Sequence, residues 1–130
     1  MIKGISHITF VVKDLQRTAL FFTKIFDAKE IYSSPTVKYF LINDFWIALN
    51  IGESPSERTY NHIAFHIDKS DIDDYISRIK EAGAEIRPDR ANRKDGEGRS
   101  VYFYDFDGHL FELHTGTLSE RLASYSHFKQ

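Results

Sequence analysis

The sequence predicts an α+β fold in which two β-α-β-β repeats, each with room for one further short strand, form a cup-shaped mixed sheet. Three observations indicate this. The segments that begin SHITF and NHIAF align without a gap, so that His7 matches His62 and Phe10 matches Phe65. Each segment changes from a strand-like alternation to a helix-like stripe of apolar residues. A hairpin pattern follows each helix, and both halves therefore have the same predicted element order.

The first repeat, about residues 4–52, opens with a strand in which Ile8, Phe10 and Val12 alternate with His7, Thr9 and Val11. Asp14 is placed to cap the helix that follows, whose apolar stripe is Leu15, Ala19, Phe22 and Phe26. A short strand is expected at Lys29–Tyr32. The hairpin comprises Lys38–Ile42, a turn at Asn43–Asp44, and Trp46–Asn50.

The second repeat, about residues 59–116, follows the same plan. Ser70 is expected to cap its helix, Ile72, Ile76 and Ile79 to form the apolar face, and Gly83 to end it. A short strand is expected at Glu85–Arg87, followed by a hairpin of Ser100–Phe106, a turn at Asp107–Gly108, and Leu110–His114. A last helix, about residues 118–127, is predicted by the capping-box pair Thr117 and Glu120, with Leu118, Leu122 and Tyr125 as its stripe.

Composition narrows the function. The 130 residues predict one domain, and the formal charge of −2 gives no reason to expect binding to nucleic acid or to a membrane. Without cysteine, a metal ion would need His, Asp or Glu ligands. No apolar run is long enough to span a bilayer, so we expect a soluble, cytoplasmic protein.

His7, His62 and Glu112 are the candidate metal ligands. The two histidines occupy matching places in the repeats, and Glu112 lies on the last strand of the second half. If the cup forms, three strands direct these side chains to one point. Two imidazoles and a carboxylate suit Mn, Fe, Co, Ni or Zn, and three protein ligands leave positions for substrate. The place of Glu112 in the first half is taken by about Ala48, which favours three ligands over four.

A lone histidine on a strand is more often a surface or hydrogen-bonded residue than a ligand. We therefore expect solvent or hydrogen-bonding roles for His66, His109 and His127, and a supporting role for His114, which shares a strand face with Glu112.

Basic residues gather in the long loop between Arg87 and Arg99, in the linker and in the last helix, and arginine suits phosphate-like anions. For each of them, a solvated surface charge is the commoner alternative. They are Arg58, Arg90, Arg93, Lys94, Arg99 and Arg121. Tyr39, Tyr60, Tyr102 and Trp46 could line a cavity or belong to the core.

The paired halves with SHITF, NHIAF and FELH resemble the vicinal oxygen chelate superfamily. More narrowly, ERTYNHIAF, GEGRSVYFYDFDGHLFELH and TGTLSERL resemble the fosfomycin-resistance metalloenzymes, and best their epoxide-hydrolase branch. The resemblance covers nearly the whole chain. It implies a divalent ion on His7, His62 and Glu112, first of all Mn(II), with Mg, Fe, Co, Ni or Zn as alternatives. The metal would act as a Lewis acid on the epoxide of fosfomycin. The resemblance also implies a homodimer whose sites are completed by strands exchanged between subunits.

The resemblance further implies roles for the residues around the metal. Thr9, Tyr102, Ser100 and Arg121 would hold the phosphonate or polarise the epoxide, helped by Arg90 or Arg93. Trp46, Tyr39 and Tyr60 would line the pocket. Transferases of the family that use glutathione also bind potassium in a loop that RKDGEGRS matches only loosely.

The nucleophile is open. In the hydrolase branch a glutamate serves as general base for water, but here the segment before the third strand is short and Val37 occupies the aligned place. General-base help contributes about 10²–10⁴-fold. The absence of this base favours a thiol cosubstrate, whereas overall similarity favours water, and Asp44 or Glu30 could replace the glutamate.

Three functions are therefore compared: a fosfomycin-inactivating metalloenzyme, another metalloenzyme of the same fold, and a drug-binding protein without chemistry. A ring-cleaving dioxygenase would use the same three ligands with Fe(II). A glyoxalase would need a fourth ligand, which Ala48 does not supply. A binding protein would usually lack the metal triad.

Overall fold

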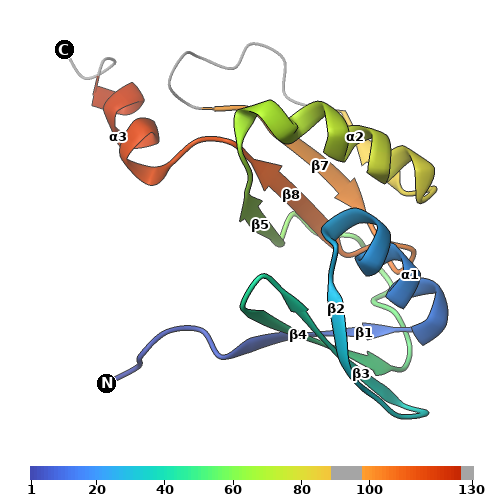
Figure 1. The fold of residues 1–130 in the computed structure, drawn as a ribbon. Coiled ribbons are helices and arrows are strands. Elements are labelled where there is room, and N and C mark those ends of the chain that lie inside the picture. Colours follow the sequence, from blue (N-terminus) through green and yellow to red (C-terminus); the bar gives the residue numbers. More distant parts are fainter. Residues whose placement is uncertain (89–97, 127–130) are drawn as a thin grey trace. The chain divides into compact units, whose positions relative to one another are not determined.

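The computed structural model describes residues 1–88 and 98–126, and it divides into two compact units (Figure 1). The first unit comprises Met1–Arg58 together with Asp105–His109. The second comprises the described part of Thr59–Tyr104 and Leu110–Gln130. Each unit contains one four-stranded mixed sheet.

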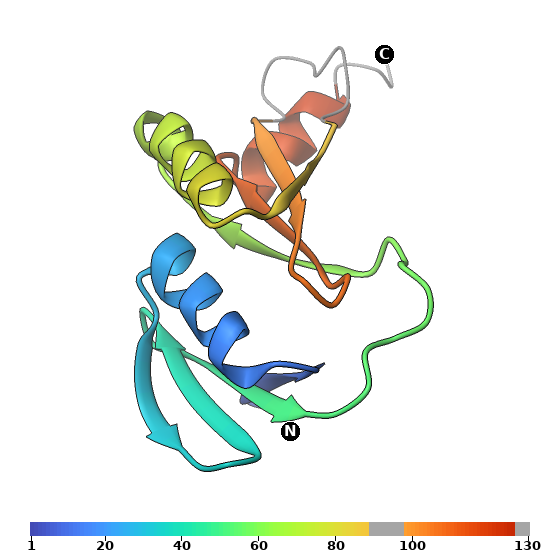
Figure 2. The same ribbon diagram turned by 90° about the vertical axis from the view of Figure 1, so that its right-hand side faces the viewer.

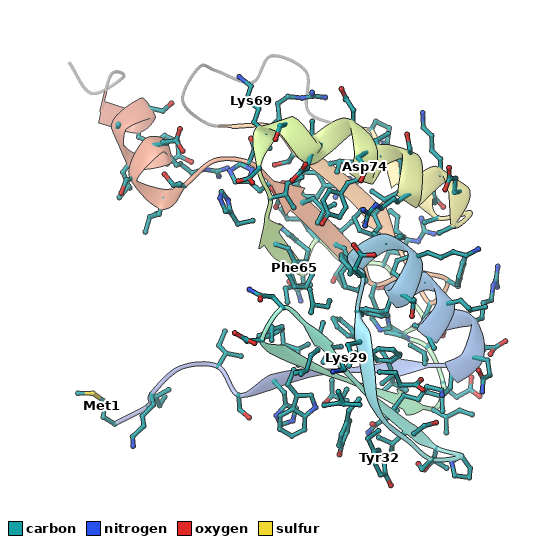
Figure 3. The ribbon with its side chains drawn as sticks, in the orientation of Figure 1. Met1, Lys29, Tyr32, Phe65, Lys69 and Asp74 are labelled. Atoms are coloured by element: carbon teal, nitrogen blue, oxygen red, sulfur yellow. The ribbon has the colours of Figure 1, made fainter. Side chains whose placement is uncertain are left out.

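The first unit has the strand order β1-β4-β3-β2, in which β1 and β4 are parallel and the other neighbours antiparallel. Lys29 and Tyr32, labelled in Figure 3, both belong to the edge strand β2. The predicted elements of the first repeat are all present, with boundaries shifted by one residue at most. They are β1 (His7–Val12), α1 (Leu15–Phe26), β2 (Lys29–Ser33), β3 (Val37–Ile42) and β4 (Phe45–Ile51).

Helix α1 covers one face of this sheet, as Figure 2 shows. The Asp14 carboxylate accepts a hydrogen bond from the Arg17 amide at 3.0 Å, so the predicted cap is confirmed. The predicted stripe of α1 is buried, and the Phe22 ring stacks on Phe40 of β3 with centroids 5.9 Å apart. Burial of this aromatic face leaves the opposite face of the sheet free to carry polar residues.

The second unit repeats this arrangement with the order β5-β8-β7-β6, in which β5 and β8 are parallel. Helix α2 packs against β6 and β7 and buries Ile72 and Ile79. The stacked rings of Phe103 and Phe111, 5.7 Å apart, lie in its core. Its elements are β5 (His62–His66), η1 (Lys69–Asp71), α2 (Ile72–Glu81), β6 (Glu85–Arg87), β7 (Ser100–Tyr104), β8 (Leu110–His114) and α3 (Leu118–Ser126).

The predicted cap of α2 was wrong. Ser70 lies inside the 3₁₀ turn η1, and the helix begins at Ile72 with Asp71 at the cap position and no side-chain capping bond. The 3₁₀ turn takes up the residues before the helix, so the hydroxyl of Ser70 is not at the helix start. Gly83 follows the end of α2 with φ 76°, as expected for a helix terminator.

The strand predicted to reach Phe106 ends at Tyr104, because Asp105 organises a five-residue connection to β8. Its carboxylate accepts the amides of Asp107 and His109 at 2.9 and 2.8 Å and contacts His109 Nδ1 at 2.7 Å. Phe106 lies under the Arg17 guanidinium, 3.6 Å from the ring centroid, and Asp107 accepts the Lys13 amide at 3.0 Å. Residues 105–109 therefore belong to the first unit.

The last helix carries the predicted capping box. Thr117 Oγ1 accepts the Glu120 amide at 3.1 Å, and Glu120 Oε1 accepts the Thr117 amide at 3.0 Å. Its apolar stripe, Leu118, Leu122 and Tyr125, is exposed in this structure.

The α+β class with two mixed sheets is thus confirmed. No helix in the described ranges is both long and apolar enough to cross a membrane.

Candidate functional site

Glu112 lies at the centre of the polar face of the second sheet. On β8 it pairs with Ala64 of β5 on one side and with Tyr102 of β7 on the other. Only 5% of its surface is exposed. A carboxylate buried within a sheet needs polar partners, because an unpaired buried charge is unfavourable in free energy.

One carboxylate oxygen of Glu112 faces His62. Glu112 Oε1 lies 2.9 Å from His62 Nε2, and His62 Nδ1 lies 2.7 Å from the Tyr60 carbonyl oxygen. The carbonyl only accepts, so Nδ1 carries the hydrogen and Nε2 of the neutral ring carries the lone pair. A lone pair and a carboxylate oxygen that face each other require a cation between them, either a proton or a metal ion.

This donor set fits a divalent metal. Ligand atoms about 2.1 Å from one ion and at right angles to each other lie about 3.0 Å apart, close to the observed separation. The bond from His62 Nδ1 to a backbone carbonyl is the outer contact that metal-binding histidines usually make. His62 and Glu112 could therefore hold a metal ion together with further ligands.

The Ser100 hydroxyl holds the other oxygen of Glu112. Ser100 Oγ lies 2.5 Å from Glu112 Oε2, and the Tyr102 hydroxyl also bonds to the carboxylate. Burial would raise the pKa of Glu112, but its contacts with Ser100, His62 and Tyr102 and the nearby His114 outweigh burial and lower the pKa. Glu112 is therefore an ionised carboxylate at neutral pH.

Tyr102 is a neutral hydrogen-bond donor at this site. Burial, its hydrogen bond to Tyr60 and the charge of Glu112 raise its pKa to about 12. Its hydroxyl lies 3.3 Å from that of Tyr60, and its ring meets His62 edge-on with centroids 5.4 Å apart. The two tyrosines and His62 thus form one wall of the polar face.

His114 and Arg121 complete this cluster in the second unit. His114 Nδ1 lies 2.6 Å from Ser100 Oγ, and His114 Nε2 lies 3.5 Å from Arg121 Nη2 of α3. Ser100 is 2% exposed, and both of its contacts are to protein groups. These contacts favour a supporting role for Ser100 over the direct substrate contact that the resemblance implies.

The first unit places His7, Thr9, Tyr39 and Trp46 on one face of its sheet. His7 pairs with Trp46 in the ladder, and Thr9 and Tyr39 flank Ala48 from the two neighbouring strands. The His7 and Trp46 rings stack with centroids 4.0 Å apart. His7 Nδ1 lies 3.0 Å from Ser6 Oγ, which leaves Nε2 as the nitrogen for a ligand.

The register also identifies the equivalent of Glu112. Thr9 pairs with Ala48 in the first sheet, as Ala64 pairs with Glu112 in the second. The first unit therefore has an alanine where the second has its carboxylate.

Trp46 has an unused donor. Its buried Nε1 has no hydrogen-bond partner among the described residues. A buried N–H without a partner is unfavourable, and a ligand oxygen would satisfy it. A cavity of about 330 Å³ in the first unit lies elsewhere, at the start of α1, where Lys13, Lys38 and Ile51 are part of its lining.

The structure thus brings together Tyr60, His62, Ser100, Tyr102, Glu112, His114 and Arg121 in one unit, and His7, Thr9, Tyr39 and Trp46 in the other. Considered alone, residues 1–88 and 98–126 contain no group of three His, Asp or Glu side chains arranged to hold a metal ion. Arg90, Arg93, Lys94 and His127 lie outside the described residues, as does most of the loosely matched potassium loop.

Comparison with known proteins gives one family. The sequence profile of the "Glyoxalase/Bleomycin resistance protein/Dioxygenase superfamily" matches residues 4–113. The fosfomycin resistance protein FosX of Listeria innocua is 58% identical over 132 residues, which cover 96% of this chain and 98% of the relative. The metallothiol transferase FosB of Shouchella clausii is 42% identical, over 96% of this chain and 88% of its own.

Solved structures agree with these sequences. FosX from Listeria monocytogenes, complexed with Mn(II) and sulfate ion, superposes with a TM-score of 0.91 at 58% identity, covering 96% of this chain and 99% of the other. A mutant of that protein was crystallised with Mn(II) and 1S,2S-dihydroxypropylphosphonic acid, and it has the same TM-score and coverage at 57% identity.

Proposed function

Because this chain belongs to the Glyoxalase/Bleomycin resistance protein/Dioxygenase superfamily, and its relatives include fosfomycin resistance proteins, we propose that it inactivates fosfomycin by metal-dependent opening of the epoxide ring. The observation that carries this proposal is the His62–Glu112 pair, 2.9 Å apart, in a chain 58% identical to FosX across its length. The pair supplies two donors of the expected triad on the residues that the resemblance names.

His7, His62 and Glu112 hold the ion, and Mn(II) is the ion we expect, since FosX structures contain it. When bound, the metal acts as a Lewis acid on the epoxide and helps to neutralise the phosphonate. In both histidines Nδ1 is engaged by a neighbouring group, so Nε2 is the ligating nitrogen.

The other predicted residues bind and orient the substrate. Tyr102 keeps its proton at neutral pH and therefore donates to an oxygen, as does the Thr9 hydroxyl. Arg121 provides a permanent positive charge and a planar set of donors for the phosphonate. Trp46 Nε1, buried and without a partner in the described chain, is a further donor. Tyr39 and Tyr60 form walls, and Arg90 or Arg93 adds positive charge.

Water is the nucleophile that the relatives favour. It attacks a ring carbon, the carbon–oxygen bond breaks, the former epoxide oxygen gains a proton and the water loses one, which gives a vicinal diol. The diol 1S,2S-dihydroxypropylphosphonic acid is what the FosX mutant binds in its crystal structure.

A thiol is the nucleophile that Val37 favours. Val37 is the first residue of β3, and its apolar side chain cannot take a proton from water. Of the two acids that could replace a base, Glu30 forms an ion pair with Lys38 at 2.9 Å, and Asp44 lies in the exposed β3–β4 turn. A thiolate brings its own nucleophilicity and forms a carbon–sulfur bond in the same ring opening.

The proposal includes a cytoplasmic homodimer in which each site takes His7 from one subunit and His62 with Glu112 from the other. The exchange of equivalent elements between subunits is a common route to such dimers. The duplicated order of the two sheets supports it, because either half can serve as the partner of the other.

Phosphorus NMR of fosfomycin tests the activity and the nucleophile together. Mn(II)-loaded protein is incubated with fosfomycin alone and with glutathione, cysteine or bacillithiol in separate tubes. We expect a new phosphorus resonance, from the diol in the absence of thiol or from a thioether in its presence. An unchanged fosfomycin resonance in every tube would refute the proposed function.

A further inference from the structure

A continuous chain of polar contacts runs from Glu112 to the last helix. Glu112 Oε2 lies 2.5 Å from Ser100 Oγ, Ser100 Oγ lies 2.6 Å from His114 Nδ1, and His114 Nε2 lies 3.5 Å from Arg121 Nη2. The last contact is the longest and weakest of the three. One end is a metal ligand of the proposed site, and the other is its anion-binding arginine.

The chemistry of the end groups determines the direction of every hydrogen bond in this chain. Arg121 only donates, so His114 Nε2 accepts and His114 Nδ1 carries the ring proton. Ser100 therefore accepts from His114 Nδ1 and has its single proton for Glu112. All three bonds run from the guanidinium toward the carboxylate, and bonds aligned in this way polarise and strengthen one another.

The strands that carry Ser100, His114 and Glu112 are fixed to each other. Ser100 and His114 are direct partners in the β7–β8 ladder. One residue further on, two hydrogen bonds join Arg99 and Thr115. The Thr115 amide donates to the Arg99 carbonyl at 3.0 Å, and Thr115 Oγ1 accepts the Arg99 amide at 2.9 Å. The side chain of His114 is only 15% exposed. The largely buried His114 ring thus stands on a fixed strand beside the buried Ser100, with little freedom to turn.

From this geometry we propose that His114 is a positioning residue that couples the two functions of the site: through Ser100 it orients the metal ligand Glu112, and through its other nitrogen it orients Arg121 for the anion. The inference rests on the proposed function for the roles of the two ends. The inference goes beyond the proposed function because it connects the metal ligand with the anion-binding arginine. Binding of the metal then favours binding of the anion, and binding of the anion favours binding of the metal.

Two substitutions of His114 distinguish the contact made by Nδ1 from the contact made by Nε2. His114→Asn places an amide near the position of Nδ1, so it can still donate to Ser100 but does not reach Arg121. His114→Gln reaches the position of Nε2, so it can still accept from Arg121 but loses the donor to Ser100. A histidine that only fills space would lose the same properties in both variants.

The readouts are binding constants that do not require turnover. Mn(II) affinity is measured from the paramagnetic resonance signal of the free ion, and anion affinity by calorimetric titration of methylphosphonate into protein saturated with Mn(II). The substitution of groups behind metal ligands typically weakens metal binding by about 10–100-fold. We expect a loss of that size in Mn(II) affinity for His114→Gln and for Ser100→Ala, and a near-native value for His114→Asn.

Methylphosphonate affinity should show the opposite pattern. We expect it to fall about tenfold in His114→Asn, as for the loss of one charge-assisted contact, and to stay near the native value in His114→Gln. His66→Asn and His66→Gln are matched controls, because His66 is the exposed β5 partner of His114 in the ladder. Thermal unfolding confirms that each variant is folded, and Ser100→Ala tests the Glu112 end even if a His114 variant does not fold.

Equal losses in His114→Asn and His114→Gln, no loss in either, or a native protein that does not bind methylphosphonate would overturn the inference. A native protein that shows the expected binding pattern but leaves fosfomycin unchanged would refute the proposed function alone.

Discussion

At the scale of single residues, the site depends on a carboxylate that stays charged although it is buried. Glu112 is 5% exposed, yet its pKa is lowered, since its contacts with Ser100, His62 and Tyr102 outweigh the cost of burial. The same bonds fix its orientation. A ligand that is both ionised and immobile binds a metal without further reorganisation.

Removing the Tyr102 hydroxyl tests this arrangement. In Tyr102→Phe the ring contacts with His62 remain, but Glu112 loses a donor that burial keeps protonated. We expect Mn(II) affinity to fall about tenfold. Tyr75→Phe on α2, away from the polar face, is the matched control. Affinity equal to that of the control would show that Tyr102 does not support the ligand.

The repeat and the alternation along single strands were enough to choose His62 and Glu112 from the sequence, because strand faces are a local property, whereas the role of Tyr102 came only from the family resemblance. The link of Ser100 to Glu112 was not predictable in that way. It depends on which residues of β7 and β8 stand opposite each other, and a signal for it would have required the length of the connection between them.

At the scale of elements, the β7–β8 connection determines the site. A two-residue turn at Asp107–Gly108 would place Phe106 opposite His109 and shift every pair by one residue. The five-residue connection centred on Asp107 instead pairs Tyr102 with Glu112 and Ser100 with His114. Since a shift by one residue moves side chains to the other face, the carboxylate of Asp105, which organises the connection, also determines which residues meet Glu112.

The start of α3 depends on a close approach between two glycines. Gly98 has φ 78°, and a Cβ added there would lie 2.6 Å from the Gly116 amide nitrogen. We expect Gly98→Ala to lower the free energy of unfolding by about 1–3 kcal/mol, measured by urea denaturation. Because Gly116 lies next to the start of α3, we also expect weaker methylphosphonate binding through displacement of Arg121.

Gly83→Ala is a control matched in backbone conformation. Gly83 has φ 76°, but nothing lies within 4 Å of an added Cβ. The Gly83→Ala variant should lose only the part of the free energy of unfolding that comes from the positive φ, and its methylphosphonate binding should not change. Identical losses in the two variants would mean that the approach of Gly98 to Gly116 is unimportant.

At the scale of the whole molecule, the two units are copies that have diverged in their polar faces. Their sheets have the same strand order, but Ala48 stands where Glu112 stands in the other copy. The repeat was predictable from the sequence, since aligned periodicities survive duplication. The pairing of the halves was not, because it depends on the match between two surfaces and not on any one strand.

Mixing two inactive variants tests the proposed exchange between subunits. His7→Ala and Glu112→Ala each disable every site in their own homodimer. In a mixed dimer with exchanged halves, one site receives both mutations and the other receives neither. Coexpression with random pairing should therefore restore about a quarter of the native fosfomycin turnover. Mixed dimers as inactive as their parents would place all three ligands within one chain.

The most direct test of the account is a Mn(II) titration, followed by paramagnetic resonance, of the native protein and of His7→Ala, His62→Ala and Glu112→Ala. The account predicts one ion per chain in the native protein and a loss of affinity of at least about 100-fold in each variant, since each removes one of three protein ligands. A native protein that binds no ion, or a variant that binds it as tightly as the native chain, would contradict the claim that these three residues hold one catalytic metal.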